Sequence, residues 1–267
     1  MTLGFIGTGN IASAVVTGLC AAPAPPGKIL VSPRGAEKAF ALAAAFPAVE
    51  VAPDNQAVVD GSATVVLALR PQDAKQALAP LAFRAEQRVI SLLALTPLET
   101  ARELVAPAGA AGAPGGAIVR ALPLPSCAER LGPIVVYPGA PWAMAFFAPL
   151  GTPLAVAEER ELNVLWALTA LIAPYFALIA EGAGWAANAG VAAPTAGTYL
   201  ATMFHALSTL AVRAPGGDFE ALTAEAMTPG GLNQQALKEI RAAGGFEAFL
   251  AALDAILARL GEPVAKR

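Results

Sequence analysis

The residues best suited to chemistry lie at the start of the chain, in the segment GFIGTGNIASAVV. It holds a G-x-G-x-x-A pattern between a strand-like run and a helical stretch. The first glycine permits a tight turn, the second lets a pyrophosphate approach the backbone, and the small alanine lets helix and strand pack closely. Free N–H groups at the helix N-terminus favour phosphate. The segment predicts a dinucleotide site with contacts at Gly7, Thr8, Gly9, Asn10, Ile11 and Ala12.

The end of the second strand-like run indicates which dinucleotide binds. An NAD site usually carries Asp or Glu there, to bind the ribose hydroxyls. This chain has Ser32-Pro33-Arg34 and no acidic residue before Glu37. A hydroxyl and a guanidinium suit a 2′-phosphate, so we expect Ser32 and Arg34 to select NADP, with NADPH preferred over NADH. The alternative is that Arg34 is only a solvated surface charge.

A second glycine pair follows a Thr-Pro step late in the chain, at TPGG (228–231). The pattern predicts Thr228 as an N-cap and Pro229 as the first helical residue. Gly230 and Gly231 would leave first-turn N–H groups uncovered, which makes an anion site sized for a carboxylate. The alternative is that Thr228 only caps the helix and the glycines only allow close packing.

Proton donors and metal ligands are scarce. The one histidine, His205, lies in an apolar helical stretch, as do Tyr175 and Tyr199, and we expect all three to be packing residues in the core or an interface. Cys127 has no adjacent base to activate it, so it is expected to be structural. A ketone would need a proton donor during hydride transfer, whereas a protonated imine needs none. The composition therefore favours an imine substrate and no metal site.

Short apolar runs alternate with helix-length segments in the first half of the chain, which predicts an α/β fold with a doubly wound, Rossmann-type parallel sheet. We expect strands at 3–7, 28–32, 49–51, 63–69, 88–94, 117–122, 133–138 and 152–157. From 158 onward the strand signal stops and Ala- and Leu-rich helices follow. We expect an NAD(P)-binding domain over 1–157 and an all-helical domain over 158–267. The Gly- and Ala-rich stretch 107–117 is expected to be an exposed loop.

The composition limits the partners. With 56% hydrophobic residues, 14% charged residues and a net charge of −3, the chain can form a sizeable core and offers no basic patch for nucleic acid. The two cysteines do not have the number or spacing of a disulfide framework, which fits a reducing cytoplasm. The uncharged stretch 162–180 is long enough to span a bilayer, but acidic residues flank it and Pro174 interrupts it. We therefore expect a helix buried in a core or subunit interface, and no membrane.

Four motifs together resemble the pyrroline-5-carboxylate reductase family, which reduces a cyclic imine to proline with NAD(P)H. They are FIGTGNIA (5–12), the Asp54-Asn55 pair, ALRPQ (68–72) and TPGGLN (228–233). The resemblance implies cofactor contacts at Asn55, Ala68, Leu69, Arg70 and Pro71. It implies catalytic or substrate contacts at Thr228, Asn233, Gly230, Gly231, Pro123 and Leu124. It also implies a homodimer or higher oligomer whose C-terminal helices interleave and complete each active site.

The departures from the family pattern concentrate on the substrate side. Leu124 and Pro125 stand where the family has Asn and Thr, and Leu232 and Asn233 replace paired threonines. The family's GSGPAY helix start has no counterpart in the segment 169–178. The pattern indicates a reductase scaffold whose pocket has been rebuilt.

The leading hypothesis is therefore an NADPH-dependent reductase of an imine or imino acid. One alternative is a dehydrogenase of a small hydroxy acid, but it would need a catalytic lysine on the long helix, and 161–212 contains none. Another is a non-catalytic NADP-binding protein with a regulatory or structural role.

Overall fold

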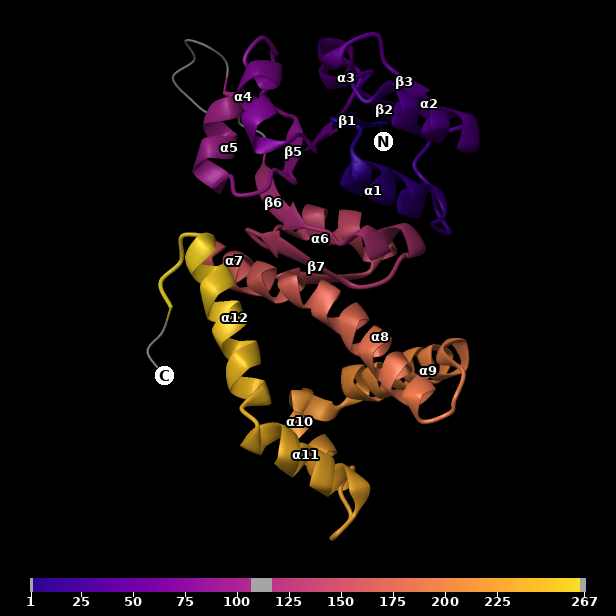
Figure 1. The fold of residues 1–267 in the computed structure, drawn as a ribbon. Coiled ribbons are helices and arrows are strands. Elements are labelled where there is room, and N and C mark those ends of the chain that lie inside the picture. The colour runs from indigo at the N-terminus through magenta and orange to yellow at the C-terminus, as the bar shows by residue number, and fades with distance from the viewer. Residues whose placement is uncertain (1, 107–116, 265–267) are drawn as a thin grey trace. The chain divides into compact units, whose positions relative to one another are not determined.

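A computed structural model describes residues 2–106 and 117–264, which form two compact units, Met1–Leu165 and Trp166–Arg267 (Figure 1). Residues 107–116 of the expected exposed loop lie outside the described residues. The domain boundary expected at 157/158 remains a prediction. The strands are β1 (Thr2–Ile6), β2 (Lys28–Val31), β3 (Val49–Val51), β4 (Thr64–Leu67), β5 (Arg88–Ser91), β6 (Ile118–Leu122), β7 (Pro133–Tyr137) and β8 (Thr152–Ala155).

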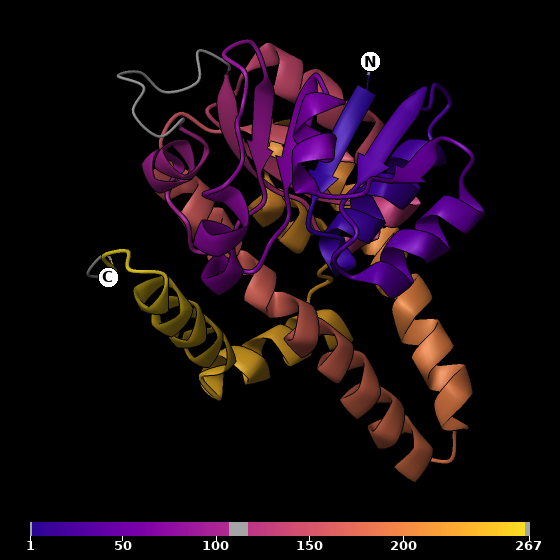
Figure 2. The ribbon, with the colours of Figure 1, turned by 90° about the horizontal axis from the view of Figure 1, so that it is seen from above.

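The eight strands form one sheet in the order β3-β2-β1-β4-β5-β6-β7-β8, and Figure 2 shows them from above. β1 pairs with β2 on one side and β4 on the other, both parallel, with Phe5 opposite Val31 and Ile6 opposite Leu67. The chain therefore reverses its direction of travel across the sheet at β1. Such a switch point opens a crevice at the carboxyl ends of the strands.

The predicted parallel arrangement is wrong for the last two strands. β7 runs antiparallel to β6, and β8 is parallel to β7. A parallel return needs a crossover of a dozen or more residues. Only the short segment 123–132, with the 3-10 helix η1 (Pro125–Glu129), joins β6 to β7. The longer segment 138–151 between β7 and β8 includes α6 (Pro141–Phe147), and it restores a parallel crossover.

Alternating strand residues build separate cores on the two faces of the sheet. Phe5 faces the core made with α1, α2, α6 and η1, whereas its neighbour Ile6 faces the core made with α3, α4 and α5. Helices on both faces confirm the doubly wound fold. The helices of this unit are α1 (Asn10–Cys20), α2 (Ala36–Ala45), α3 (Asn55–Asp60), α4 (Pro71–Leu78), α5 (Leu98–Val105), α6 and the start of α7 (Glu159–Leu168).

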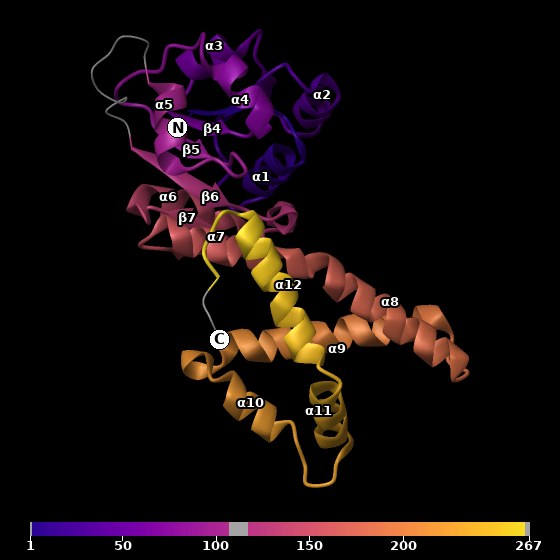
Figure 3. The same ribbon diagram turned by 60° about the vertical axis from the view of Figure 1, so that its left-hand side comes forward.

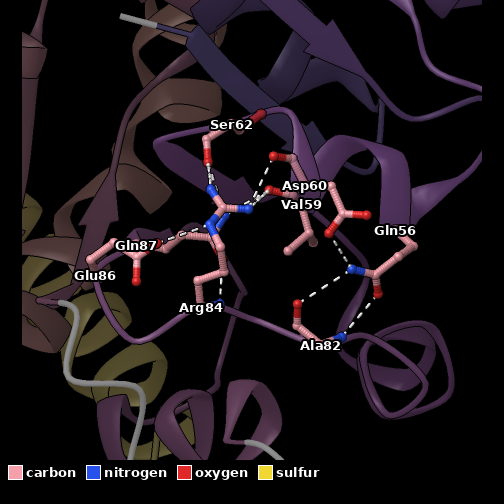
Figure 4. A network of polar contacts seen from close by, with 8 residues as sticks. All are labelled: Gln56, Val59, Asp60, Ser62, Ala82, Arg84, Glu86 and Gln87. Carbon is pink, nitrogen blue, oxygen red and sulfur yellow. Dashed lines mark hydrogen bonds and ion pairs between the residues drawn. The ribbon is translucent and has the colours of Figure 1, made fainter.

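A polar network fixes the C-terminus of α3, a helix too short to be stable alone (Figure 4). The Arg84 guanidinium donates to the carbonyl oxygens of Val59, Asp60 and Ser62, at 3.1, 3.0 and 2.7 Å. The buried Gln87 amide donates to the Val59 and Ser62 oxygens as well. These donors satisfy carbonyls that a helix end leaves unpaired.

We expect Arg84→Met to lower the free energy of unfolding by about 1–2 kcal/mol, because it removes three charge-assisted hydrogen bonds at a partly exposed site. Urea unfolding measures the change. Arg102→Met is the matched control: among the described residues Arg102 pairs with Glu99 on its own helix, at 3.8 Å, and its loss should cost under about 0.5 kcal/mol. Equal losses in the two variants would contradict a capping role for Arg84.

The second unit is entirely helical among its described residues, as predicted, and α8 and α9 pack along each other (Figure 3). Its helices are the end of α7, α8 (Ile172–Asn188), α9 (Ala193–Arg213), α10 (Phe219–Glu225), α11 (Leu232–Ala242) and α12 (Gly245–Arg259). Within its described part, the buried apolar residues are Ala167, Ala183 and Ala196. Large apolar side chains such as Trp185 and Tyr199 are exposed.

The expectation that the apolar stretch 162–180 is buried in the core of its own chain is wrong. The continuous helical segment Glu159–Asn188 is long and apolar enough to cross a membrane, and 11% of its most apolar window is buried. Length and composition are weak evidence for a span, since helices of soluble proteins pass the same test. The alternative expectation, a subunit interface, remains open for this surface. His205 is likewise exposed rather than packed in the core.

Candidate cofactor and substrate site

The glycine turn joins β1 to α1 in a conformation that needs glycine at its first position. Gly7 has a φ of +94°, and a Cβ there would lie 2.5 Å from the Ala68 carbonyl oxygen. Gly9 is the N-cap of α1, and a Cβ at this position would meet no atom within 4 Å. The first turn of α1 has no acidic residue and no side-chain cap. Open space and free N–H groups therefore coincide where a pyrophosphate is expected.

Ser32 supports this turn rather than a phosphate. Its hydroxyl accepts a hydrogen bond from the Gly7 N–H at 2.9 Å, and its carbonyl oxygen accepts one from the Thr8 hydroxyl at 3.0 Å. Ser32 is fully buried, so its side chain presents no surface to a 2′-phosphate. The expected contact of Ser32 with a 2′-phosphate stays a prediction, and in the structure its side chain supports the glycine turn. Thr8 is buried too, so we expect any cofactor contact of Thr8 to come from its backbone.

Two exposed cations lie beside the turn. Arg34 follows β2, and its guanidinium lies 3.5 Å from the Asp73 carboxylate on α4, across the carboxyl end of β1. Lys38 on α2 donates a hydrogen bond to the Asn10 side-chain oxygen at the start of α1. Pairing between exposed groups is weak, so Arg34 can exchange its partner for a phosphate at little cost.

The remaining expected cofactor contacts lie at neighbouring strand ends. Asn55 is the first residue of α3, after β3, and the Asp54 side chain caps that helix by accepting from the Ala57 N–H at 2.8 Å. The segment from Ala68 to Pro71 joins β4 to α4, with Pro71 at the first helical position. The structure thus brings all the predicted cofactor residues to one edge of the sheet, around its switch point. This arrangement fits an extended dinucleotide.

Comparisons with known proteins agree with this geometry. Residues 2–95 match the family model described as NADP oxidoreductase, coenzyme F420-dependent. Over 97% of its length the chain is 28% identical to the pyrroline-5-carboxylate reductase of Pseudomonas aeruginosa, covering 96% of that protein. The chain is therefore similar to a pyrroline-5-carboxylate reductase along nearly its whole length. Solved reductases share the fold: that of Coxiella burnetii aligns with a TM-score of 0.83 and 22% identity over 98% of both chains. The Plasmodium falciparum enzyme, solved with NADP bound, gives 0.78 and 14% over 97% of both chains.

Near the expected substrate contacts Pro123 and Leu124, the chain carries an arginine paired with a carboxylate. Arg120 on β6 is 4% exposed, and its guanidinium donates to Glu159 Oε1 at 2.5 Å. The same carboxylate oxygen accepts from the Leu98 N–H at 2.7 Å. Beyond β6, Pro123 is buried and Leu124 is half-buried. The Arg120 charge is therefore paired with the Glu159 carboxylate inside the fold and is unavailable to a ligand.

The sequence gives no hint of one unusual residue near this edge. Leu95 follows β5, has a φ of +56° and is 60% exposed. A bulky residue in this left-handed conformation costs about 1–2 kcal/mol. Neighbouring interactions hold the loop in place: Leu93 lies in the core below α4 and α5, and the Thr96 hydroxyl donates to the Ala94 oxygen at 3.1 Å. Strain of this kind collects at functional sites.

The late glycine turn differs from its prediction. α11 begins at Leu232 with Gly231 as its N-cap, so Thr228 is not the cap and Pro229 is not helical. Thr228 to Gly231 form a β-turn closed by the Gly231 N–H donating to the Thr228 oxygen at 2.8 Å, with Gly230 at a φ of +73°. Pro followed by a positive-φ Gly is typical of a type II turn, which competes with helix here.

The donors of this turn are largely engaged within it. The Gly230 N–H donates to Gln234 Oε1 at 2.9 Å, and the Asn233 side-chain amide donates to the Ala226 oxygen at 2.9 Å. The turn thus brings Thr228, Gly230, Gly231 and Asn233 together, with the Gly230 and Gly231 N–H groups and the Asn233 amide already paired. The first-turn N–H groups of α11 from Leu232 to Gln234 remain for an anion.

The cysteines supply no reactive group. Cys127 is fully buried beneath α1, and burial raises the pKa of its thiol to about 11. Burial raises the pKa of the half-buried Cys20 thiol as well. Both thiols are protonated near neutral pH, which fits the structural role expected of Cys127.

Proposed function

We propose that this protein is an NADPH-dependent oxidoreductase that reduces the C=N bond of an imine or cyclic imino acid. The observation that carries the proposal is the uncapped N-terminus of α1, open at Gly9 and located at the switch point of the sheet. Similarity to pyrroline-5-carboxylate reductase along nearly the whole chain supports the reaction class. NADP in the Plasmodium falciparum relative supports the cofactor.

The residues of the first unit have distinct roles in the proposal. Gly7, Gly9 and the first-turn N–H groups at Asn10, Ile11 and Ala12 hold the pyrophosphate. Arg34 binds the 2′-phosphate, with Ser32 and Thr8 fixing the turn beneath it. Asn55 and the segment Ala68–Pro71 line the rest of the cofactor site. We assign cofactor binding to residues 1–157 and substrate binding and dimerisation to 158–267.

Pro123 and Leu124 are the candidate substrate contacts of the first unit, and the late glycine turn supplies those of the second unit. Thr228 and Asn233 are the candidate catalytic residues, and Gly230 and Gly231 the candidate substrate contacts. When bound, NADPH would supply a hydride to the imine carbon and be oxidised to NADP, and the imine nitrogen would carry a proton taken from water. A protonated imine needs no acid from the protein, which fits a chain with one histidine, exposed on α9.

The proposal is tested by titrating NADPH and NADH into the purified protein and then following nicotinamide absorbance with an imine added. We expect NADPH to bind more tightly than NADH and to be oxidised when imine is present. Tight binding without turnover of any cyclic or open-chain imine would favour the non-catalytic NADP-binding alternative. Turnover of a hydroxy acid with NADP instead would favour the dehydrogenase alternative.

Arg34→Ser should raise the Kd for NADPH about ten- to a hundred-fold, because it removes a charge-assisted contact to the 2′-phosphate. The Kd for NADH should not change. Fluorescence titration of both cofactors measures the effect. Arg88→Ser is the control, since Arg88 is an exposed arginine at the opposite, amino-terminal end of β5. If Arg34→Ser raised the Kd for NADPH and the Kd for NADH by the same factor, Arg34 would not be a contact of the 2′-phosphate.

We further propose a homodimer or higher homo-oligomer formed through the C-terminal helices, in the cytoplasm. The support is the exposed apolar surface of the second unit, which includes Phe176, Trp185 and Tyr199 at 63, 75 and 68% exposure. A monomeric soluble protein rarely exposes so much apolar surface. Light scattering on the eluted protein distinguishes a monomer from the proposed oligomer.

A further inference from the structure

We infer that the substrate is an apolar imine without a carboxylate, and that Leu95 is a specificity-determining residue for it. The inference rests on the proposed NADPH-dependent imine reduction and names the class of imine. It draws on three independent features: an exposed leucine held in an unfavourable conformation, an arginine whose charge is already neutralised, and backbone donors that are already paired.

Leu95 lies at the carboxyl edge of the sheet, between the two groups of expected ligand contacts. β5 stands between β4 and β6, so the loop after β5 lies between the cofactor segment Ala68–Pro71 and the substrate segment at Leu124. A glycine or asparagine would adopt a φ of +56° with less strain, yet the chain places a large apolar side chain there and leaves it 60% exposed. An exposed apolar side chain on a strained backbone, beside the strand ends where the cofactor is expected, indicates contact with an apolar ligand.

The cations near this edge do not favour a substrate carboxylate. Arg120, on the neighbouring strand β6, is buried against Glu159. Arg70 is exposed, but it precedes α4 at the end of β4, within the expected cofactor contacts. The first unit therefore offers apolar side chains rather than a cation where Leu95 and Leu124 lie.

The glycine turn of the second unit gives the same indication separately. The two glycine N–H groups expected to bind a carboxylate are engaged, because Gly230 donates to Gln234 and Gly231 donates to the Thr228 oxygen, which leaves the first-turn N–H groups of α11 as the open donors of the described turn. A carboxylate would have to displace the Gln234 side chain to reach the Gly230 N–H. An imine without a carboxylate requires no such exchange.

The test compares NADPH oxidation with two probes of the same ring, 2-methyl-1-pyrroline and 1-pyrroline-5-carboxylate. We expect kcat/KM to be at least about ten-fold higher for the methyl compound. Leu95→Asn keeps the side-chain size and tolerates the left-handed backbone but adds polarity. It should lower kcat/KM for the methyl compound about ten-fold while changing the value for the carboxylate compound less.

Leu154→Asn is the matched control, because Leu154 is a partly exposed leucine on the edge strand β8. A preference for the carboxylate compound in the unsubstituted protein would overturn the inference and leave the proposed imine reduction intact. Equal effects of Leu95→Asn and Leu154→Asn would overturn the role of Leu95. Bound NADPH without oxidation by either probe, or by other imines, would instead defeat the proposed function itself.

Discussion

Gly9→Asp should abolish NADPH binding while leaving the fold as stable as before. A side chain at Gly9 meets no atom within 4 Å, so it enters the space where the pyrophosphate is expected. Its carboxylate there would repel the phosphates at close range. We expect the Kd for NADPH to rise at least about a hundred-fold, which corresponds to about 2.7 kcal/mol. Isothermal titration measures the binding loss.

The same substitution should preserve or slightly raise the free energy of unfolding. Gly9 is the N-cap of α1, with an extended backbone that Asp also adopts. An Asp at the N-cap stabilises a helix by a few tenths of a kcal/mol more than a Gly does, and its negative charge interacts favourably with the helix dipole. A control, Gly9→Ala, adds a methyl group without charge and should weaken binding less. A Gly9→Asp protein that still binds NADPH tightly would place the cofactor elsewhere.

The sequence predicts the cofactor side well because local patterns determine it. The turn Gly7-Thr8-Gly9 needs a strand before it, a helix after it and small residues within it. All three features can be predicted from neighbouring residues in the sequence. The alternation of apolar runs also predicts the sheet, because parallel strands are buried on both faces. The direction of β7 is not readable in the same way, since it depends on how far the segment 123–132 can reach.

The substrate side resists prediction because backbone conformation determines it. Thr-Pro-Gly-Gly satisfies the rules for a helix start and those for a type II turn, and the turn forms with local hydrogen bonds from Gly230 to Gln234 and from Gly231 to Thr228, so α11 starts at Leu232. Ser32 has a suitable side chain for a phosphate, but its full burial is a property of the folded turn. No local pattern predicts a leucine at positive φ, so Leu95 emerges only in three dimensions.

Breaking the pair of Arg120 with Glu159 is expected to destabilise the first unit strongly. Glu159→Ala would leave the Arg120 guanidinium buried without its counter-ion and the Leu98 N–H without its acceptor. Removing one partner of a fully buried pair costs about 3–5 kcal/mol. The Glu159 side chain is 27% exposed, so water compensates in part, and we expect a loss of about 2–4 kcal/mol.

A double variant separates the unpaired charge from the lost packing. Replacing both groups, as in Arg120→Met with Glu159→Met, removes the buried charge altogether, and apolar replacement of buried pairs is often close to neutral. We therefore expect the double variant to be more stable than Glu159→Ala in urea unfolding, despite carrying two substitutions. A double variant less stable than the single one would show that the pair stabilises the fold by attraction, beyond relieving its own desolvation. In the unsubstituted protein the Arg120 charge is paired with Glu159 whichever outcome is found, so neither outcome makes this charge available to a ligand.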